Sequence, residues 1–217
     1  MAIELNDGSS YVAYPVIKHQ EIGQHCSLAV IKFQQRDCLR RDQTSNQLVK
    51  IPNGKYDAQN NPKYKQELVI HAIYVDGTMS AGIGDQSSVP AAGERVRLIL
   101  KSRSFGDWIE AKKNHRGGKF NVGDVLNVAT THAQQYDQNG SPKGEKIETQ
   151  EQANKVPRNV TIGFYGSLEL VKAEDHPFSA QFVPQAEAAY MADAAAEQQR
   201  KAIPLQPTAE ETEEGWG

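Results

Sequence analysis

Five stretches rich in β-branched and aliphatic residues constrain the fold of this chain more than any other feature. Each has the length of a strand, and turn residues such as the Asp76-Gly77 pair separate them. The stretches are 27–36, 67–75, 95–101, 124–131 and 160–171. We therefore expect a mostly β protein.

Two further segments predict helices. Residues 104–115 carry lysines in their last turn and precede a pair of glycines, which are helix stop signals. Residues 185–201 are rich in alanine and lie between Pro184 and Pro204. We expect this second helix to pack loosely on the body of the protein or on another subunit.

The order of these elements is three strands, a helix and two strands. This is the order of an OB-fold, a five-stranded Greek-key barrel with a helix between strands three and four. The predicted fold class is therefore all-β with minor α: an OB-fold barrel, a C-terminal helix and a disordered acidic tail. An unrelated small β-barrel or sandwich is the alternative.

Length and composition predict one modest core with long polar loops, because 217 residues contain only 38% hydrophobic residues. We divide the chain into an N-terminal extension at 1–26, an OB-fold domain at 27–172, a C-terminal helical segment at 173–203 and a flexible acidic tail at 204–217.

The third and fifth strands show the clearest patterns. In the third, apolar residues at 96, 98 and 100 alternate with Arg95, Arg97, Ile99 and Lys101, so three cations are expected on its outward face. The alternative is that these cations lie on an ordinary solvent-exposed sheet face and bind no ligand. The fifth contains Gly163 and Gly166, which predict a bulge or a tight bend.

Two connections, 37–66 and 132–159, are unusually long for a compact domain, and such loops are commonly functional or disordered. In an OB-fold they flank the ligand-binding face of strands two and three. Both mix basic residues with tyrosines, a pattern that neutralises phosphates and stacks on bases; ordinary solvated loops are the alternative. The DNA-binding candidates are Arg40, Arg41, Lys55, Tyr56, Lys63, Tyr64, Lys65, Arg95, Arg97, Lys101, Arg103, Trp108, Tyr136, Lys143, Lys146 and Arg158. Trp108 has an equally good interpretation as a core residue.

The charge is unevenly distributed along the chain. Residues 1–172 hold 22 Lys and Arg against 18 Asp and Glu, whereas residues 173–217 hold 2 against 9. A basic body with an acidic tail suggests that the body meets a polyanion. The tail residues Glu210, Glu211, Glu213, Glu214 and Trp216 predict a docking peptide, because a merely solvated terminus needs no indole. An ordinary disordered terminus is the alternative.

Other signals are absent from the sequence. It contains no phosphate loop, dinucleotide fingerprint, Gly-x-Ser-x-Gly elbow or carboxylate set at metal-nuclease spacing, so we expect no enzyme and no cofactor. Cys26 and Cys38 form neither a disulfide framework nor, with His19 and His25, a zinc pattern, so no metal is expected. Without an apolar run of 18 residues or a signal sequence, we expect a cytoplasmic protein without a membrane span.

These features together resemble the single-stranded-DNA-binding proteins of tailed phages. The resemblance in fold covers 27–171, and the resemblance in the tail covers 210–216. It implies a protein that binds and protects single-stranded DNA without strong sequence preference during replication or recombination, in the host cytoplasm. It also implies that replication or recombination proteins bind the tail. Tails of this family commonly end in aspartates and a phenylalanine, whereas this one has glutamates and Trp216 followed by Gly217.

Two other classes stay open at this point: a virion or assembly component with a β-barrel domain, and a DNA-processing enzyme. A monomer and a homodimer are both compatible with the sequence.

Overall fold

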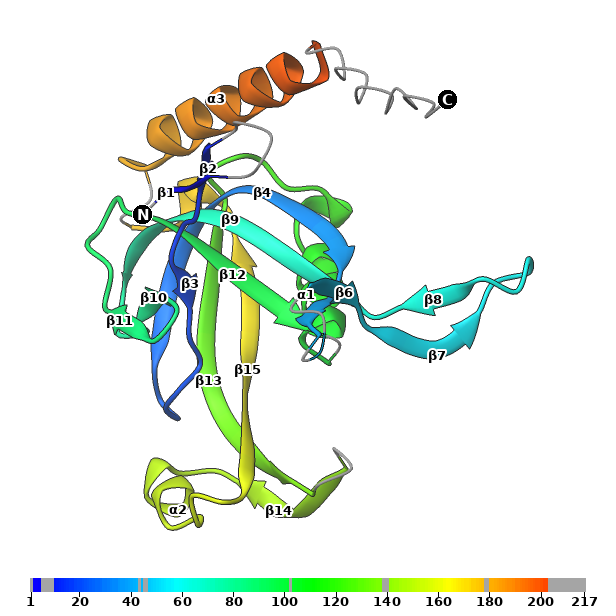
Figure 1. The fold of residues 1–217 in the computed structure, drawn as a ribbon. Helices are drawn as coiled ribbons and strands as arrows, with labels where there is room; N and C mark the ends of the chain where they lie inside the picture. Colours follow the sequence, from blue (N-terminus) through cyan, green and yellow to red (C-terminus); the bar gives the residue numbers. More distant parts are fainter. Residues whose placement is uncertain are drawn as a thin grey trace, which may run out of the picture.

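The computed structural model describes residues 2–4, 10–42, 44, 47–101, 103–137, 141–177 and 180–202. It contains all five expected strands and both expected helices (Figure 1). The strands are β4 (His25–Asp37), β9 (Gln66–Gly77), β12 (Arg95–Lys101), β13 (Val125–Tyr136) and β15 (Thr161–Val171). The helices are α1 (Arg103–Asn114) and α3 (Val183–Ala202). The protein is thus mostly β, as expected.

These five strands form an antiparallel run in the order β12-β9-β4-β13-β15. A closed barrel would require β12 to pair with β15. No such pairing occurs among the described residues, and the sheet is open. Instead α1 contacts β12 and β15, the two ends of this run, and inserts the buried Trp108 into the core. The predicted closed barrel is therefore not confirmed, because a helix occupies the gap between the edges.

The N-terminal segment adds strands that sequence patterning missed because they are only two or three residues long. β3 (Val16–Ile17) runs parallel to β12 and antiparallel to β10 (Ala81–Ile83), which pairs with β11 (Gln86–Ser88). The large sheet is therefore mixed. β1 (Ala2–Glu4) and β2 (Ser10–Val12) pair separately from it.

The two long connections have secondary structure of their own. The first forms two hairpins, β5 (Leu39–Arg41) with β6 (Leu48–Lys50) and β7 (Pro52–Tyr56) with β8 (Pro62–Tyr64). The second forms β14 (Pro142–Ile147) and the short α2 (Gln150–Asn154), which begins with a capping box at Thr149. Figure 1 shows β7 and β8 projecting from the body, with β14 and α2 at the far end of the β13–β15 ribbon.

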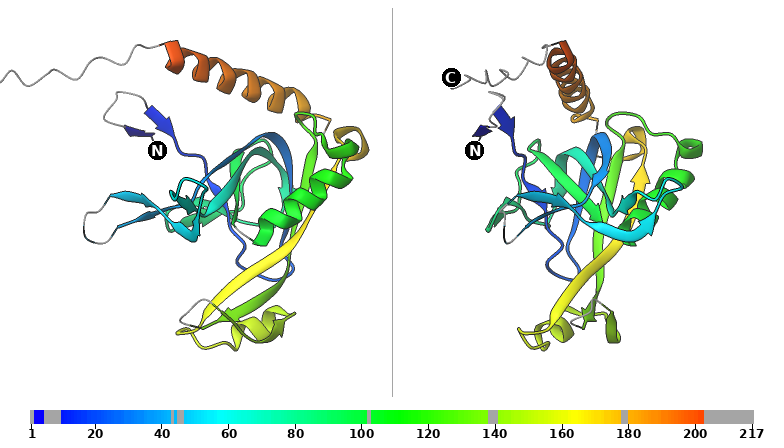
Figure 2. Two further views of the ribbon diagram at one scale, coloured as in Figure 1. Left: turned by 90° about the vertical axis from the view of Figure 1, so that its right-hand side faces the viewer. Right: turned by 45° about the vertical axis from the view of Figure 1, so that its right-hand side comes forward.

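The core has two layers because β4 and β9 are buried on both faces. Leu28 and Val30 on β4 point toward the layer that contains Trp108. Ala29 and Ile31 point the other way, toward Phe182 and the first turns of α3. Figure 2 shows α3 crossing above the sheet on this outer side. The expected docking of this helix on the body is thus confirmed.

The bend in the β13–β15 ribbon depends on Gly166. The register between these strands shifts between Thr130 and His132. A Cβ atom on Gly166 would lie 1.6 Å from the carbonyl oxygen of Ala129, so only glycine fits. The unpaired residue of this irregularity is Thr131 on β13, so the bulge expected in the fifth strand lies in its partner strand, next to the residue opposite Gly166.

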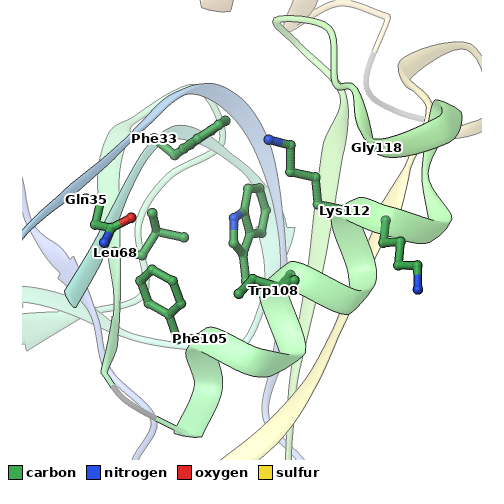
Figure 3. A pocket seen from close by; sticks show the side chains of 9 residues that line it. Phe33, Gln35, Leu68, Phe105, Trp108, Lys112 and Gly118 are labelled. Atoms are coloured by element: carbon green, nitrogen blue, oxygen red, sulfur yellow. The ribbon is translucent and has the colours of Figure 1, made fainter. Parts of the chain in front are cut away.

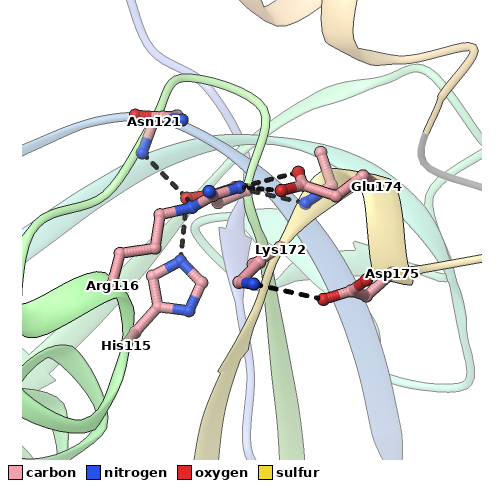
Figure 4. A network of polar contacts seen from close by, with 8 residues as sticks. His115, Arg116, Asn121, Lys172, Glu174 and Asp175 are labelled. Carbon is pink, nitrogen blue, oxygen red and sulfur yellow. Dashed lines mark hydrogen bonds and ion pairs between the residues drawn. The ribbon is translucent and has the colours of Figure 1, made fainter.

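A buried carboxylate connects α1 to the strands. Asp124 accepts hydrogen bonds from His115 Nε2 at 2.8 Å, from the Arg116 guanidinium, and from the backbone N–H groups of Asn121 and Ala173 (Figure 4). Burial would raise the pKa of Asp124, but these hydrogen bonds outweigh it and lower the pKa. The end of α1, the start of β13 and the end of β15 are therefore held together by one charged group.

The cysteines and the helices add two simpler observations. Cys26 and Cys38 are both buried and free. Within the described ranges no helix is both long and apolar enough to span a bilayer.

Candidate nucleic-acid interface

A row of basic and imidazole side chains crosses the outer face of the sheet. In the strand register, Lys32 on β4 lies opposite His71 on β9, which lies opposite Arg97 on β12. Their neighbours Phe33, Ile70 and Leu98 point into the core, so these three side chains share the other face. The outward orientation predicted for Arg95, Arg97 and Lys101 is correct, since Val96, Leu98 and Leu100 are buried.

Arg95 extends this row and is held by two other parts of the chain. Its Nη2 lies 2.5 Å from Asp193 Oδ2 on α3, and its guanidinium stacks 4.3 Å above the Tyr14 ring. Lys32 Nζ binds the same Asp193 oxygen at 2.6 Å. Arg97 donates from Nε to the Tyr14 carbonyl oxygen at 3.0 Å. The part of the row that lies on β12, Arg95 and Arg97, is thus partly covered by α3 and by the N-terminal segment.

Lys32, Arg95 and Arg97 give the row a net positive charge, which the Asp193 carboxylate partly offsets. Burial, followed by repulsion from Lys32 and Arg95, lowers the pKa of His71 to about 4, so its imidazole is neutral at pH 7. Burial would raise the pKa of the Asp193 carboxyl, but hydrogen bonds from Arg95 and Lys32 outweigh it and lower the pKa. Nδ1 of His71 and Nε of Arg95 are buried without a hydrogen-bond partner among the described residues.

The first long connection presents most of its predicted residues to solvent. The exposed ones are Arg40, Lys55, Tyr56, Lys63 and Lys65, and Tyr56 is 62% exposed. Tyr64 is half-buried because Lys50 lies 5.2 Å from its ring centroid, and Lys50 also pairs with Asp37 at 2.8 Å. Tyr56 is therefore the tyrosine of these hairpins with an available ring face.

The second long connection is divided between packing and exposure. Tyr136 and Tyr165 share a hydrogen bond between their hydroxyls, and Tyr165 stacks on His132. The ring of Tyr136 is thus half-buried in the ribbon. Lys143, Lys146 and Arg158 are exposed, and Figure 1 shows β14 well away from the β7–β8 hairpin. The structure does not bring the two loops together into one cleft.

Trp108 lies on the other side of the sheet from the basic row. It is 3% exposed, packs against Phe33 with ring centroids 5.6 Å apart, and belongs to the core, as its second interpretation predicted. Together with Phe105, Ile109 and Leu68 it lines an open cavity of about 460 Å³ (Figure 3). Lys112 closes one side, with its Nζ 4.7 Å from the Phe33 ring centroid.

Some predicted residues cannot be placed. The side chains of Arg41 and Arg103 lie outside the described part of the structure, as do Glu210, Glu211, Glu213, Glu214 and Trp216. Across the described residues, no group of three His, Cys, Asp or Glu side chains is arranged to hold a metal ion.

Sequence reasoning missed Lys32, His71, Tyr14 and Asp193. Two of them left a signal. Lys32 interrupts the apolar run from residue 28 to residue 33, and Asp193 follows Ala186 and Ala189 at the spacing of one helix face. Both are charged groups at positions where patterning predicts burial, which indicates a polar partner.

The chain was compared with protein-family models, curated proteins and solved structures. None matches it.

Proposed function

We propose that this protein binds single-stranded DNA without strong sequence preference, during replication or recombination. The observation that carries the proposal is the row formed by Lys32, His71 and Arg97, with Arg95 beside it, on three adjacent strands. Three cations around a neutral imidazole on one sheet face suit a phosphate backbone, which needs charge neutralisation and hydrogen-bonding groups but no sequence readout.

The topology supports this proposal. The run β12-β9-β4-β13-β15, with a helix between its third and fourth strands in chain order, has the connectivity of an OB-fold whose barrel is open. In that fold the ligand-binding face is the outer face of the second and third strands, here β9 and β12. The basic row lies on this face.

The β7–β8 hairpin supplies what the row lacks. Lys55 and Lys63 add cations, and Tyr56 offers an exposed ring on which a base can stack. In this proposal, one part of the bound strand follows the row on the sheet and another part reaches the hairpin, where a base stacks on Tyr56. The acidic segment that contains Trp216 is proposed to recruit a replication or recombination protein.

The test is a fluorescence-anisotropy titration of labelled single-stranded DNA, duplex DNA and RNA, each at several salt concentrations. We expect single-stranded DNA to bind, with log K falling linearly against log salt by about 0.7 per phosphate contact. The double variant Lys55→Ala, Lys63→Ala should flatten this slope. Lys155→Ala is the control, because Lys155 is an exposed lysine directly after α2, where it pairs with Glu151 at 2.7 Å.

Absence of salt-dependent binding to any of the three nucleic acids contradicts the proposal and favours a virion or assembly component. Cleavage of the DNA when a divalent metal is added would instead favour the DNA-processing enzyme.

A further inference from the structure

Asp193 occupies a position on α3 where an apolar residue is expected. Ala186 and Ala189 pack against the β4–β9 face, and Asp193 is the next residue along the same face of the helix. Its side chain is only 19% exposed. A charge that is partly removed from water lowers stability unless it is paired, and here Lys32 and Arg95 pair with it.

The cluster around Asp193 holds more donor capacity than one carboxylate uses. Two cations share the single carboxylate, and Arg97 adds positive potential at His71. Nε of Arg95 and Nδ1 of His71 are buried and make no hydrogen bond to any described residue. Buried polar atoms are normally hydrogen-bonded, so the Arg95 Nε donor, with the His71 imidazole beside it, indicates room for a ligand with more acceptor oxygens than a carboxylate.

We propose that Lys32, His71 and Arg95 form a phosphate-binding site, and that the Asp193 carboxylate occupies this site when no ligand is bound. The ligand is a phosphodiester group of the bound strand, so the inference rests on the proposed function. A phosphate accepts two parallel hydrogen bonds from an arginine fork, whereas Arg95 now uses Nη2 alone toward Asp193. α3 is therefore a competitor built into the binding face.

Only part of α3 needs to move for the exchange. Phe182 and Ala186 anchor the start of the helix in the outer core layer, and Gln185 donates to the Gly93 carbonyl oxygen at 2.7 Å. Beyond Asp193, residues 195–199 are exposed. Figure 2 shows this end of the helix leading away from the sheet. Phosphate can replace Asp193 while the first turns stay seated.

The decisive variant is Asp193→Asn, which keeps the size of the side chain and removes its charge. We expect it to bind a labelled oligothymidylate at least about 5-fold more tightly than wild type at low salt, the size of an ordinary coupling between two sites. Glu187→Gln is the matched control, because it removes one charge from an exposed position on the same helix. Equal affinities of the two variants would overturn the inference, leaving Asp193 as a structural anchor.

A second measurement follows α3 directly. Burial raises the pKa of the Cys26 thiol to about 12 and also raises that of Cys38, so neither competes for a thiol-reactive dye. Met191 is 67% exposed on α3, and Met191→Cys provides one labelling site there. Saturating oligothymidylate should change the emission of the dye. Unchanged emission while anisotropy shows binding would overturn the inference.

Pyrophosphate separates failure of the site from failure of the proposed function. It should raise the Tm of Asp193→Asn more than that of wild type, because the variant lacks the competing carboxylate. That result without oligonucleotide binding supports the phosphate site and contradicts the DNA function. Oligonucleotide binding that Asp193→Asn leaves unaltered supports the DNA function and contradicts the site.

Discussion

The buried carboxylate of Asp124 and the half-buried carboxylate of Asp193 differ in how completely their hydrogen-bonding capacity is satisfied. Asp124 receives two backbone N–H bonds, the His115 bond and the Arg116 guanidinium, which together use both of its oxygens. Asp193 receives its two partners on one oxygen, and those partners keep unused donors nearby. A saturated carboxylate stabilises one arrangement, whereas an unsaturated cluster can exchange its anion. We therefore assign Asp124 to the structure and Asp193 to the proposed binding face.

This assignment predicts that Asp124→Asn lowers the free energy of unfolding by about 3 kcal/mol at pH 7, the usual cost of breaking a buried charged pair. The folded state lowers the pKa of Asp124. The stabilisation is therefore complete above the unfolded pKa of about 3.9 and is lost as pH falls through the lower folded value. Urea unfolding between pH 7 and pH 2.5 measures both effects, and the difference between variant and wild type should shrink below about pH 4.

Asp85→Asn serves as the control for this comparison, since Asp85 is exposed in the turn between β10 and β11. It should match wild type at every pH. A constant gap between Asp124→Asn and wild type down to the lowest pH would contradict the assignment of the pH effect to Asp124.

At the scale of elements, the sequence predicted strands most accurately where one face of the strand is buried in the core. The alternation along β12 predicted its bounds and its outward face correctly, because half of its side chains are buried and the signal has a period of two. β7 left no such signal, since all five of its residues are exposed. The missing β12–β15 pairing also has no local signal, because closure depends on where α1 packs.

The candidate site was predictable in part for the same reason. Arg95, Arg97 and Lys101 follow from the alternation on one strand. The partners of Arg95 come from 81 residues upstream at Tyr14 and 98 residues downstream at Asp193, so only the folded structure could reveal them. Tyr136 was predicted as a free ring, but its hydrogen bond to Tyr165 depends on the register of two strands.

The β7–β8 hairpin has no core of its own, so its residues can be changed without loss of the fold. Tyr56→Ala should weaken single-stranded DNA binding by about 1–3 kcal/mol, the usual contribution of one stacked base, and leave the Tm unchanged. Tyr190→Ala is the control, because Tyr190 is 43% exposed on α3. Full affinity of Tyr56→Ala would leave the hairpin a purely electrostatic role.

At the scale of the whole molecule, charge is separated along the chain and again across its surface. The net charge of −3 combines a body with excess Lys and Arg and a C-terminal region with excess Asp and Glu. Within that acidic region, Asp193 already lies on the basic face. The glutamates at 210–214 lie outside the described residues, but they provide the same chemistry at higher density. We therefore expect the glutamates of the tail to compete, as Asp193 does, with DNA for the same cations.

Deleting residues 210–217 should therefore tighten single-stranded DNA binding a few-fold at low salt and have no effect at 1 M salt, where the Debye length is about 3 Å. Anisotropy titrations over a salt series measure this change, and a constant Tm shows that the fold is retained. Replacing the four glutamates by glutamine should reproduce the gain in affinity, whereas Trp216→Ala should not, because the competition depends on charge. Pull-downs with a replication or recombination protein should show the opposite: Trp216→Ala should lose the partner, and the glutamine variant should lose less of it. The reason is that an indole that fills a pocket acts as an anchor in such interfaces. Equal affinities at every salt concentration, together with identical pull-downs, would reduce the tail to a solubilising end and leave Asp193 as the competitor on the binding face.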